Sequence, residues 1–383
     1  MNKKWATVWV GSMCFYAFMF YLRWPLFPKM LGVEPRFVDL SGLFSQVACV
    51  ERQLDIGSSY KYAARSCAFV YTEASYFALS YVSDVKYLAV TLGLIQGALV
   101  VTVLVIFFAR FLREFNAHNV LLSLSLLLSP PVMLLIERGN VDGTVFLGVV
   151  LAAQLYEKRL PVAVFVVALT SLIKFYTLPL AWILSFGTKA WWKMMSLCLL
   201  GFVSLALFRE AWWMRGRAPY PTNAGFGNPM LGKYLQPGGS DQFIDLLVGL
   251  SVCVIALLAG HYLKKWKKSS LNFQFVSSAD SSRIRVFIFL AIVHLTCYFL
   301  TANYDYRLIF VAIQLPLMLE ILNLTRKWKY FYCMNTIVIF WFSFNVGILQ
   351  PIGDLSIGIH TVSLLMILKE NRSQIREVLK VAK

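Results

Sequence analysis

Four short polar segments interrupt an otherwise apolar chain, and each carries residue types that can do chemistry. They lie at residues 36–39, 137–143, 174–176 and 303–307. Charged groups beside hydrocarbon are costly, so such residues are functional candidates by default. Their carboxylates can transfer protons, and their lysine and arginine side chains can bind an anion.

Asp39 is the acid of the first segment, which has the sequence Arg-Phe-Val-Asp. A carboxylate at a membrane edge can act as a general base if it reaches the proton that it abstracts. The alternative is a helix-capping or solvated acid. The residue types alone leave both interpretations open.

Segment 137–143, Glu-Arg-Gly-Asn-Val-Asp-Gly, is a predicted hairpin between two apolar runs. Its polar residues can satisfy the ends of the two helices. That task needs only one or two capping side chains, so the adjacent Glu137 and Arg138 indicate an ion pair that organises something else. Glu137 is a second candidate base, and Arg138, Asn140 and Asp142 are candidates for substrate binding.

The last two segments place cations beside aromatic rings. Their candidate substrate-binding residues are Lys174, Tyr176, Tyr304, Asp305 and Arg307. Lys174 has apolar neighbours, and its ammonium group either snorkels to the interface or faces an anion such as a phosphate. Segment 303–307 is either a capped turn with an interfacial pair of tyrosines or a site in which Arg307 binds phosphate and aromatic rings stack on a sugar or lipid.

The elements that must position these residues are apolar helices. Hydrophobic residues make up 59% of the 383 residues and charged residues 14%, whereas a soluble domain has roughly 25% charged residues. Many runs reach the ~17–25 residues needed to cross a bilayer. We therefore predict an all-α integral membrane protein, a single polytopic domain over 1–383 with about 12 transmembrane helices.

The predicted spans include two whose nature the sequence leaves open. They lie at roughly 5–22, 87–108, 119–136, 143–157, 160–173, 175–188, 193–209, 242–263, 285–300, 307–323, 330–349 and 355–368. The pair around Lys174 is either two crossings or one re-entrant segment. The first resembles a signal peptide, but no small-residue cleavage site follows it, so we predict an uncleaved helix.

The basic residues set the predicted orientation. With the N-terminus in the cytoplasm, 22 of the 36 lysines and arginines fall on cytoplasmic segments. Cytoplasmic loops are enriched in Lys and Arg, so both termini are predicted to be cytoplasmic. The net charge of +17 then reflects placement beside the membrane, and no nucleic-acid partner is predicted. All four polar segments face the opposite side, the periplasm or exterior.

Two outer loops are long, at 23–86 and 210–241. In the first, apolar residues recur at helical spacing: Leu40, Leu43, Phe44, Val47 and Leu54. This spacing predicts an amphipathic helix that lies on the membrane surface. The second loop is rich in proline and glycine and is predicted to be irregular.

Cys49 and Cys67 share the first outer loop. On an oxidising face they are disulfide candidates, the alternative being two free thiols. His261, His294 and His360 are scattered along the sequence, and no His, Cys and carboxylate set has metal-binding spacing. No phosphate-binding or dinucleotide-binding loop is present either. We therefore expect no metal and no cofactor.

Taken together, the four segments resemble motifs of polytopic glycosyltransferases of the C-type superfamily, in particular glycosyltransferase family 87. The matching stretches, 37–40, 137–142, 174–179 and 303–308, extend over most of the chain. The family usually has Gln where this chain has Asn140. Its lysine segment often continues directly with Tyr-Pro, whereas Thr177 and Leu178 separate Tyr176 from Pro179 here.

The resemblance implies a transferase of a bacterial inner membrane. Its donor would be a polyprenyl-phosphate sugar held among membrane lipid, and its acceptor a glycan or glycolipid. Asp39 would be the general base, and the anomeric configuration would invert. The chemistry needs little else, because a glycosyl phosphate already carries a good leaving group and requires only a base and cations for the departing phosphate.

Two other functions remain possible from the sequence. A transporter or flippase of a lipid-linked or small anionic substrate would also have many helices and buried charges. Transporters more often place polar residues at the bilayer midplane, in repeated halves, whereas here they fall at one interface and no repeat is visible. The third possibility is a non-catalytic scaffold for polysaccharide assembly.

The orientation can be tested with reporter fusions. Fusions after Lys268 and at the C-terminus should report a cytoplasmic location, and a fusion within 215–240 an external one, because basic residues concentrate on alternate loops. The opposite pattern would place Asp39 on the wrong side of the membrane for a reaction at the outer face.

Overall fold

The computed structural model describes residues 3–21, 37–67, 73–81, 88–112, 116–185, 225–226, 251, 254, 258, 274–276, 280–300, 303–343 and 350–380. Their regular structure is mostly helical, with one pair of two-residue strands. The predicted spans 193–209 and nearly all of 242–263 lie outside the described residues, as does loop 210–241 apart from 225–226.

Within the described residues, three helices are long and apolar enough to cross a membrane. They are α6 (Leu88–Phe111), α15 (Ser281–Leu300) and α19 (Gln350–Glu370). Helices α7 (Ala117–Leu127) and α8 (Pro130–Arg138) form a fourth candidate span when taken together. The described part of the chain is therefore mostly helical and contains apolar candidate spans. The total of about twelve transmembrane helices stays a prediction.

The predicted helix 119–136 is broken, which corrects the sequence analysis. Its halves α7 and α8 meet at an angle of 45°. The break falls at Ser129, whose backbone is extended, just before Pro130 and Pro131. A proline has no N–H to continue the helical ladder, and it disfavours helical geometry in the residue before it.

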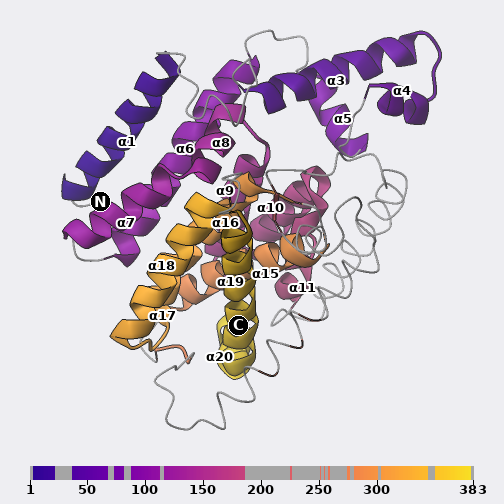
Figure 1. Cartoon of the computed structure of the whole chain (residues 1–383). Helices are drawn as coiled ribbons and strands as arrows, with labels where there is room; N and C mark the ends of the chain where they lie inside the picture. The colour runs from indigo at the N-terminus through magenta and orange to yellow at the C-terminus, as the bar shows by residue number, and fades with distance from the viewer. Residues whose placement is uncertain are drawn as a thin grey trace.

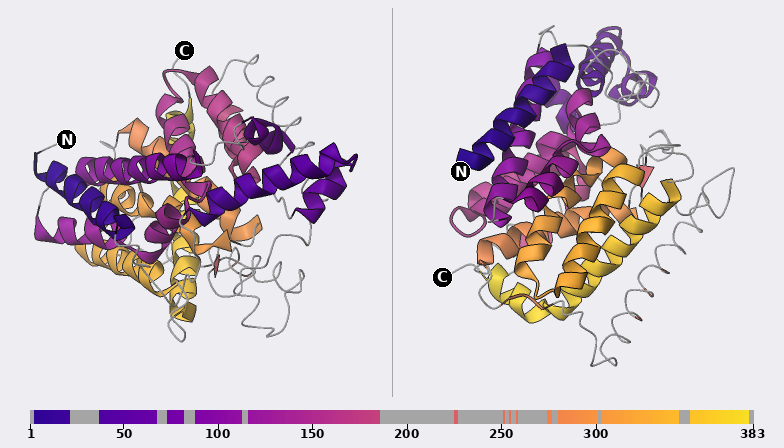
Figure 2. Two further views of the ribbon diagram at one scale, coloured as in Figure 1. Left: turned by 90° about the horizontal axis from the view of Figure 1, so that it is seen from above. Right: turned by 60° about the vertical axis from the view of Figure 1, so that its left-hand side comes forward.

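Seven further helices of the described residues complete a bundle around a continuous apolar core (Figure 1). They are α1 (Lys3–Tyr21), α9 (Asp142–Leu155), α10 (Leu160–Ile173), α16 (Ile309–Ala312), α17 (Gln314–Ile321), α18 (Arg326–Phe342) and α20 (Arg372–Leu379). Figure 2 shows α1 alongside α6 and α18 alongside α19, while α9 packs between α10 and α15.

A second correction concerns the predicted helix 175–188. Lys174 ends α10 in an extended conformation, and the chain continues as a single 3-10 turn, η1 (Phe175–Thr177). A helix resumes only at α11 (Leu180–Ser185), after Pro179. The proline again explains the interruption, because it cannot lie inside a continuous helix without loss of a hydrogen bond.

Two histidines that are scattered in the sequence meet inside the bundle. The rings of His294 and His360 are 5.5 Å apart. His294 Nε2 lies 3.1 Å from Thr361 Oγ1, and His360 Nε2 lies 2.8 Å from Gln314 Oε1. All four side chains are buried. These contacts connect α15, α17 and α19 through polar groups, a common way to join helices in an apolar medium.

Three helices of segment 23–86, the predicted first outer loop, lie together at one end of the bundle (Figure 1). They are α3 (Val38–Asp55), α4 (Tyr60–Ser66) and α5 (Glu73–Ser80). The predicted amphipathic helix is thus present as α3. Its apolar face packs on α4, α5 and α6, with Leu40, Leu43 and Val47 buried. Protein therefore covers the face that the sequence assigned to the membrane surface.

A disulfide explains how this small unit is closed. Cys49 of α3 and Cys67, directly after α4, are bonded, with 5.7 Å between their Cα atoms. The bond closes a loop of 18 residues, and it joins α4 to the helix whose first turn carries Asp39.

Removing this bond should destabilise the α3–α5 unit by about 2–4 kcal/mol, because the cross-link limits the freedom of the unfolded loop. Cys49→Ser and Cys67→Ser should each lower the thermal midpoint, as should reductant on the wild-type protein. Cys14→Ser is the matched control, since Cys14 is an exposed free cysteine, and it should leave the midpoint unchanged. Freely alkylated Cys49 and Cys67 in unreduced protein would contradict the bond.

Candidate functional site

Side chains from three of the four polar segments, together with Arg307 of the fourth, form one connected cluster. Asp39 lies in the first turn of α3, and Arg138 is the last residue of α8. Asp142 begins α9, and Lys174 follows α10. Arg307 lies in the 3-10 turn η2 (Asp305–Leu308), which packs on α8. Helix ends therefore supply every charged group.

Asp39 is held through both of its carboxylate oxygens. Arg138 donates from Nε to Asp39 Oδ1 at 2.8 Å, and its Nη2 donates to the same oxygen. Asn140 Nδ2 donates to Asp39 Oδ2 at 2.6 Å. The side chain of Asp39 keeps 15% of its surface exposed. The carboxylate is thus oriented and still accessible.

The backbone just before Asp39 explains how α3 is docked. Phe37 has a left-handed conformation, with φ of 55°, and its N–H donates to Glu137 O at 2.8 Å. Its ring fills a socket between two glycines. A Cβ atom would lie 2.3 Å from the ring at Gly93 and 2.9 Å at Gly139. Backbone strain of this kind persists only when the surroundings fix it, and here the socket does so.

Asn140 links the two carboxylates of the cluster. Its Nδ2 group serves Asp39, and its Oδ1 accepts a hydrogen bond from the backbone N–H of Asp142 at 2.9 Å. Before it, Gly139 closes α8 with a φ of 60°, a conformation that suits glycine. The hairpin therefore does cap helix ends, and one of its caps also orients Asp39.

Asp142 forms the buried centre of the site. None of its surface is exposed. Tyr176 Oη donates to Asp142 Oδ1 at 2.5 Å, and Arg307 Nε donates to Oδ2 at 2.9 Å. The Arg307 guanidinium also lies over the Tyr176 ring, 5.0 Å from its centre, in a cation–π contact. The start of α9 adds a favourable helix dipole for the carboxylate.

Lys174 belongs to the same electrostatic environment. Its burial lowers its pKa below the ordinary lysine value, and the nearby Asp142 carboxylate opposes that shift. Arg307 lowers the pKa further, and Asp39 opposes this. Lys174, Arg307 and the two carboxylates are therefore close enough for the other three groups to shift the pKa of Lys174.

Residues 225–226 of the predicted second outer loop reach the site as a short strand. β1 (Gly225–Phe226) pairs antiparallel with β2 (Asn303–Tyr304), which leads directly into η2. The side chains of Tyr304 and Asp305 lie outside the described residues, so their predicted contacts with substrate stay predictions.

The predicted substrate-binding residues differ in access. Asp142 and Tyr176 are fully buried and Asn140 nearly so, and each is hydrogen-bonded to another residue of the cluster. Their predicted role in substrate binding stays a prediction. Arg138, predicted as a substrate contact, is paired with Asp39. The side chains of Asp39 and Arg138 are partly exposed to solvent, and the side chain of Lys174 is half-buried. Glu137, the second candidate base, has one carboxylate oxygen shielded from solvent.

Sequence analysis missed Gln96, which contacts the hairpin from α6. Its Nε2 donates to the Asn140 carbonyl, and its Oε1 accepts from Thr144 Oγ1 at 3.2 Å. Its place in the sequence could have pointed to it, because Gln96 is an amide inside the most apolar candidate span. Polar residues in such spans are functional candidates, and the structure shows that Gln96 is buried.

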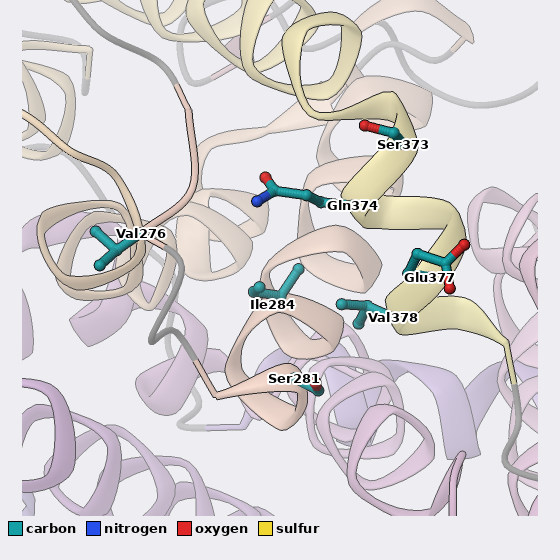
Figure 3. A pocket seen from close by; sticks show the side chains of 7 residues that line it. All are labelled: Val276, Ser281, Ile284, Ser373, Gln374, Glu377 and Val378. Carbon is teal, nitrogen blue, oxygen red and sulfur yellow. The ribbon is translucent and has the colours of Figure 1, made fainter.

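A cavity elsewhere in the molecule does not share these residues. It lies between the start of α15 and α20, and its polar lining is Ser281, Ser373, Gln374 and Glu377 (Figure 3). No predicted site residue lines it. Within the described ranges, no group of three His, Cys, Asp or Glu side chains is placed to hold a metal ion.

Comparisons with protein-family models, curated proteins and solved structures found no match for this chain.

Asp142→Asn should destabilise the protein by about 3–5 kcal/mol, because it leaves the buried Arg307 guanidinium without its carboxylate. Thermal or denaturant unfolding measures this loss. Glu377→Gln removes an exposed carboxylate from an ion pair with Lys380 and should change stability little. Equal losses of stability in the two variants would show that the buried Asp142–Arg307 pair stabilises the protein no more than an exposed pair does.

Proposed function

We propose that this chain is a membrane glycosyltransferase that moves a sugar from a polyprenyl-phosphate donor to an acceptor hydroxyl at the outer face of a bacterial inner membrane. The observation that supports this most is the state of Asp39. It is an accessible carboxylate, oriented through both oxygens, in one cluster with Lys174 and Arg307. A base beside cations is what transfer from a glycosyl phosphate requires.

The proposed reaction is a single displacement. Asp39 takes the proton of the acceptor hydroxyl as the acceptor oxygen bonds to the anomeric carbon. The bond from that carbon to the phosphate oxygen breaks, and polyprenyl phosphate leaves with the electron pair. The configuration inverts. About twelve spans, with both termini in the cytoplasm, would place the donor's tail among helices and lipid.

Lys174 and Arg307 are proposed to stabilise the departing phosphate. Two observations support this role: Asp142 binds Arg307, and both Asp142 and Arg307 shift the pKa of Lys174. Burial makes charge on Lys174 costly, and an incoming anion would offset that cost, so phosphate binding would favour the charged form. Arg138 would then serve Asp39, with Glu137 as the reserve base.

One observation favours a transporter or flippase as the second candidate. His294, His360 and Gln314 are buried together, and the two histidines lie in the middle of α15 and α19. Polar groups at mid-span are typical of transport sites. Such a protein would move a lipid-linked or small anionic substrate without changing it.

Reconstituted full-length protein and a panel of radiolabelled polyprenyl-phosphate pentoses and hexoses separate these functions. A transferase releases polyprenyl phosphate and labels a glycan or glycolipid acceptor. A flippase moves intact donor across the vesicle membrane, and a scaffold does neither. Intact donor in every reaction would reject the transferase.

Asp39→Asn should reduce transfer on the order of 10²-fold or more, because it keeps the shape of the side chain and removes its ability to accept a proton. Donor binding should persist. The matched control is Asp280→Asn, since Asp280 also lies at a helix start and pairs with an arginine, Arg110. Near-normal turnover of Asp39→Asn, with loss in Glu137→Gln, would move the base to Glu137.

A further inference from the structure

We infer that Gln96 is a positioning residue, one that holds the Asn140 turn so that Asn140 can orient Asp39. The inference concerns the same site as the proposed glycosyl transfer and rests on that function for its catalytic consequence. The positioning itself follows from the hydrogen bonds of Gln96 with Asn140 and Thr144.

The two ends of the Gln96 amide bind the two sides of Asp142. Nε2 donates to the carbonyl of Asn140, two residues before Asp142, and Oε1 accepts from Thr144, two residues after it. Reversing the amide would set its oxygen against the Asn140 carbonyl, so the hydrogen bonds fix one orientation. Gln96 therefore spans the junction from hairpin to α9.

Packing leaves the amide little room to move. A Cβ atom at Gly143 would lie 2.3 Å from Gln96 Nε2. On the same face of α6, Gly93 receives the Phe37 ring, and a Cβ atom at Gly97 would lie 2.9 Å from Ile136. Residues three and four apart share a helix face. One face of α6 thus contacts both partners of the Asp39–Asn140 hydrogen bond, α3 through Phe37 and the hairpin through Gln96.

The consequence is specific to one hydrogen bond. Asn140 Nδ2 reaches Asp39 only if the turn keeps its backbone in place. The carbonyl of Asn140 accepts the backbone N–H of Gly143 at 2.9 Å, and Gln96 is the side chain that also donates to it. Loss of the Gln96 donor should uncouple Asp39 from Asn140 while the Arg138 contact with Asp39 remains. Asp39 would keep its ion pair with Arg138 and lose its hydrogen bond with Asn140.

A double-mutant cycle in thermal unfolding tests this without any substrate. Asp39→Ala and Asn140→Ser each remove the hydrogen bond between the two residues, and serine keeps a capping oxygen for α9. In the wild-type background the double variant should lose less than the sum of the single losses. In Gln96→Leu the losses should add. Gln96→Glu still accepts from Thr144, and with its carboxylate ionised at alkaline pH it cannot donate to Asn140. Under that condition it should behave like Gln96→Leu, and it serves if the leucine variant does not fold.

Two comparisons separate positioning from general damage. Thr102→Val removes a hydrogen-bonding side chain from the same helix, one that binds Trp9 away from the site, and should preserve the coupling. Gly143→Ala should abolish it by displacing the amide. Combining Gly143→Ala with Gln96→Ala should recover packing and thermal stability but not the coupling.

Turnover of the labelled polyprenyl-phosphate sugars adds the catalytic result. Gln96→Leu should lower kcat on the order of 10²-fold, with KM for the donor nearly unchanged, because a small misplacement of a reacting group is costly and the cations are retained. Coupling that persists in both Gln96→Leu and Gln96→Glu would overturn the inference. If the wild-type protein does not turn over any donor, the proposed function fails, and the thermal cycle still decides the role of Gln96.

Discussion

The buried carboxylate of Asp142 is the interaction on which the rest of the site depends. It binds Tyr176, 34 residues away, and Arg307, 165 residues away. A buried ion is tolerable only when its partners replace water, so the three side chains must be present together. Their packing fixes the end of α10 and the η2 turn against the start of α9. The accessible part of the site is built outward from this centre through Asn140 and Asp39.

The two carboxylates differ because their surroundings differ. Asp142 has no exposed surface, and each of its oxygens is occupied by a protein donor, which leaves it no route to a substrate. Asp39 is also bound at both oxygens, but it lies at the edge of the cluster and stays partly exposed. The difference in burial therefore gives the two acids different roles. Asp142 holds Arg307 inside the protein, whereas Asp39 is accessible at the edge of the cluster.

The sequence predicted the components of this site better than their connections. The four polar segments could be found because charges stand out in an apolar chain, and hydrophobic spacing located α3 and most of the described helices. Which charge pairs with which could not be found, because Asp39 and Arg138 are 99 residues apart and no local pattern connects them. The left-handed Phe37 was also invisible, since a tertiary socket imposes its conformation. The bend at Ser129 could have been predicted, because Pro130 and Pro131 signal it directly.

The charges of the cluster follow the polarity of the helices that carry them. Asp39 and Asp142 lie in the first turns of α3 and α9, whereas Arg138 ends α8 and Lys174 follows α10. Helix dipoles favour acids at the start and bases at the end of a helix, which explains the sign at these four positions. Arg307 is the exception, because it lies in η2, directly before α16. Helix dipoles do not explain why charges are used at all. Neutral Ser, Thr or Asn side chains can cap a helix in apolar surroundings at a lower desolvation cost than ions. Ionised groups from separate segments nevertheless converge in this cluster, where Asp39 pairs with Arg138 and Asp142 with Arg307. The proposed function would give these charges a task that neutral caps cannot perform, which is to bind an anionic group beside an oriented carboxylate.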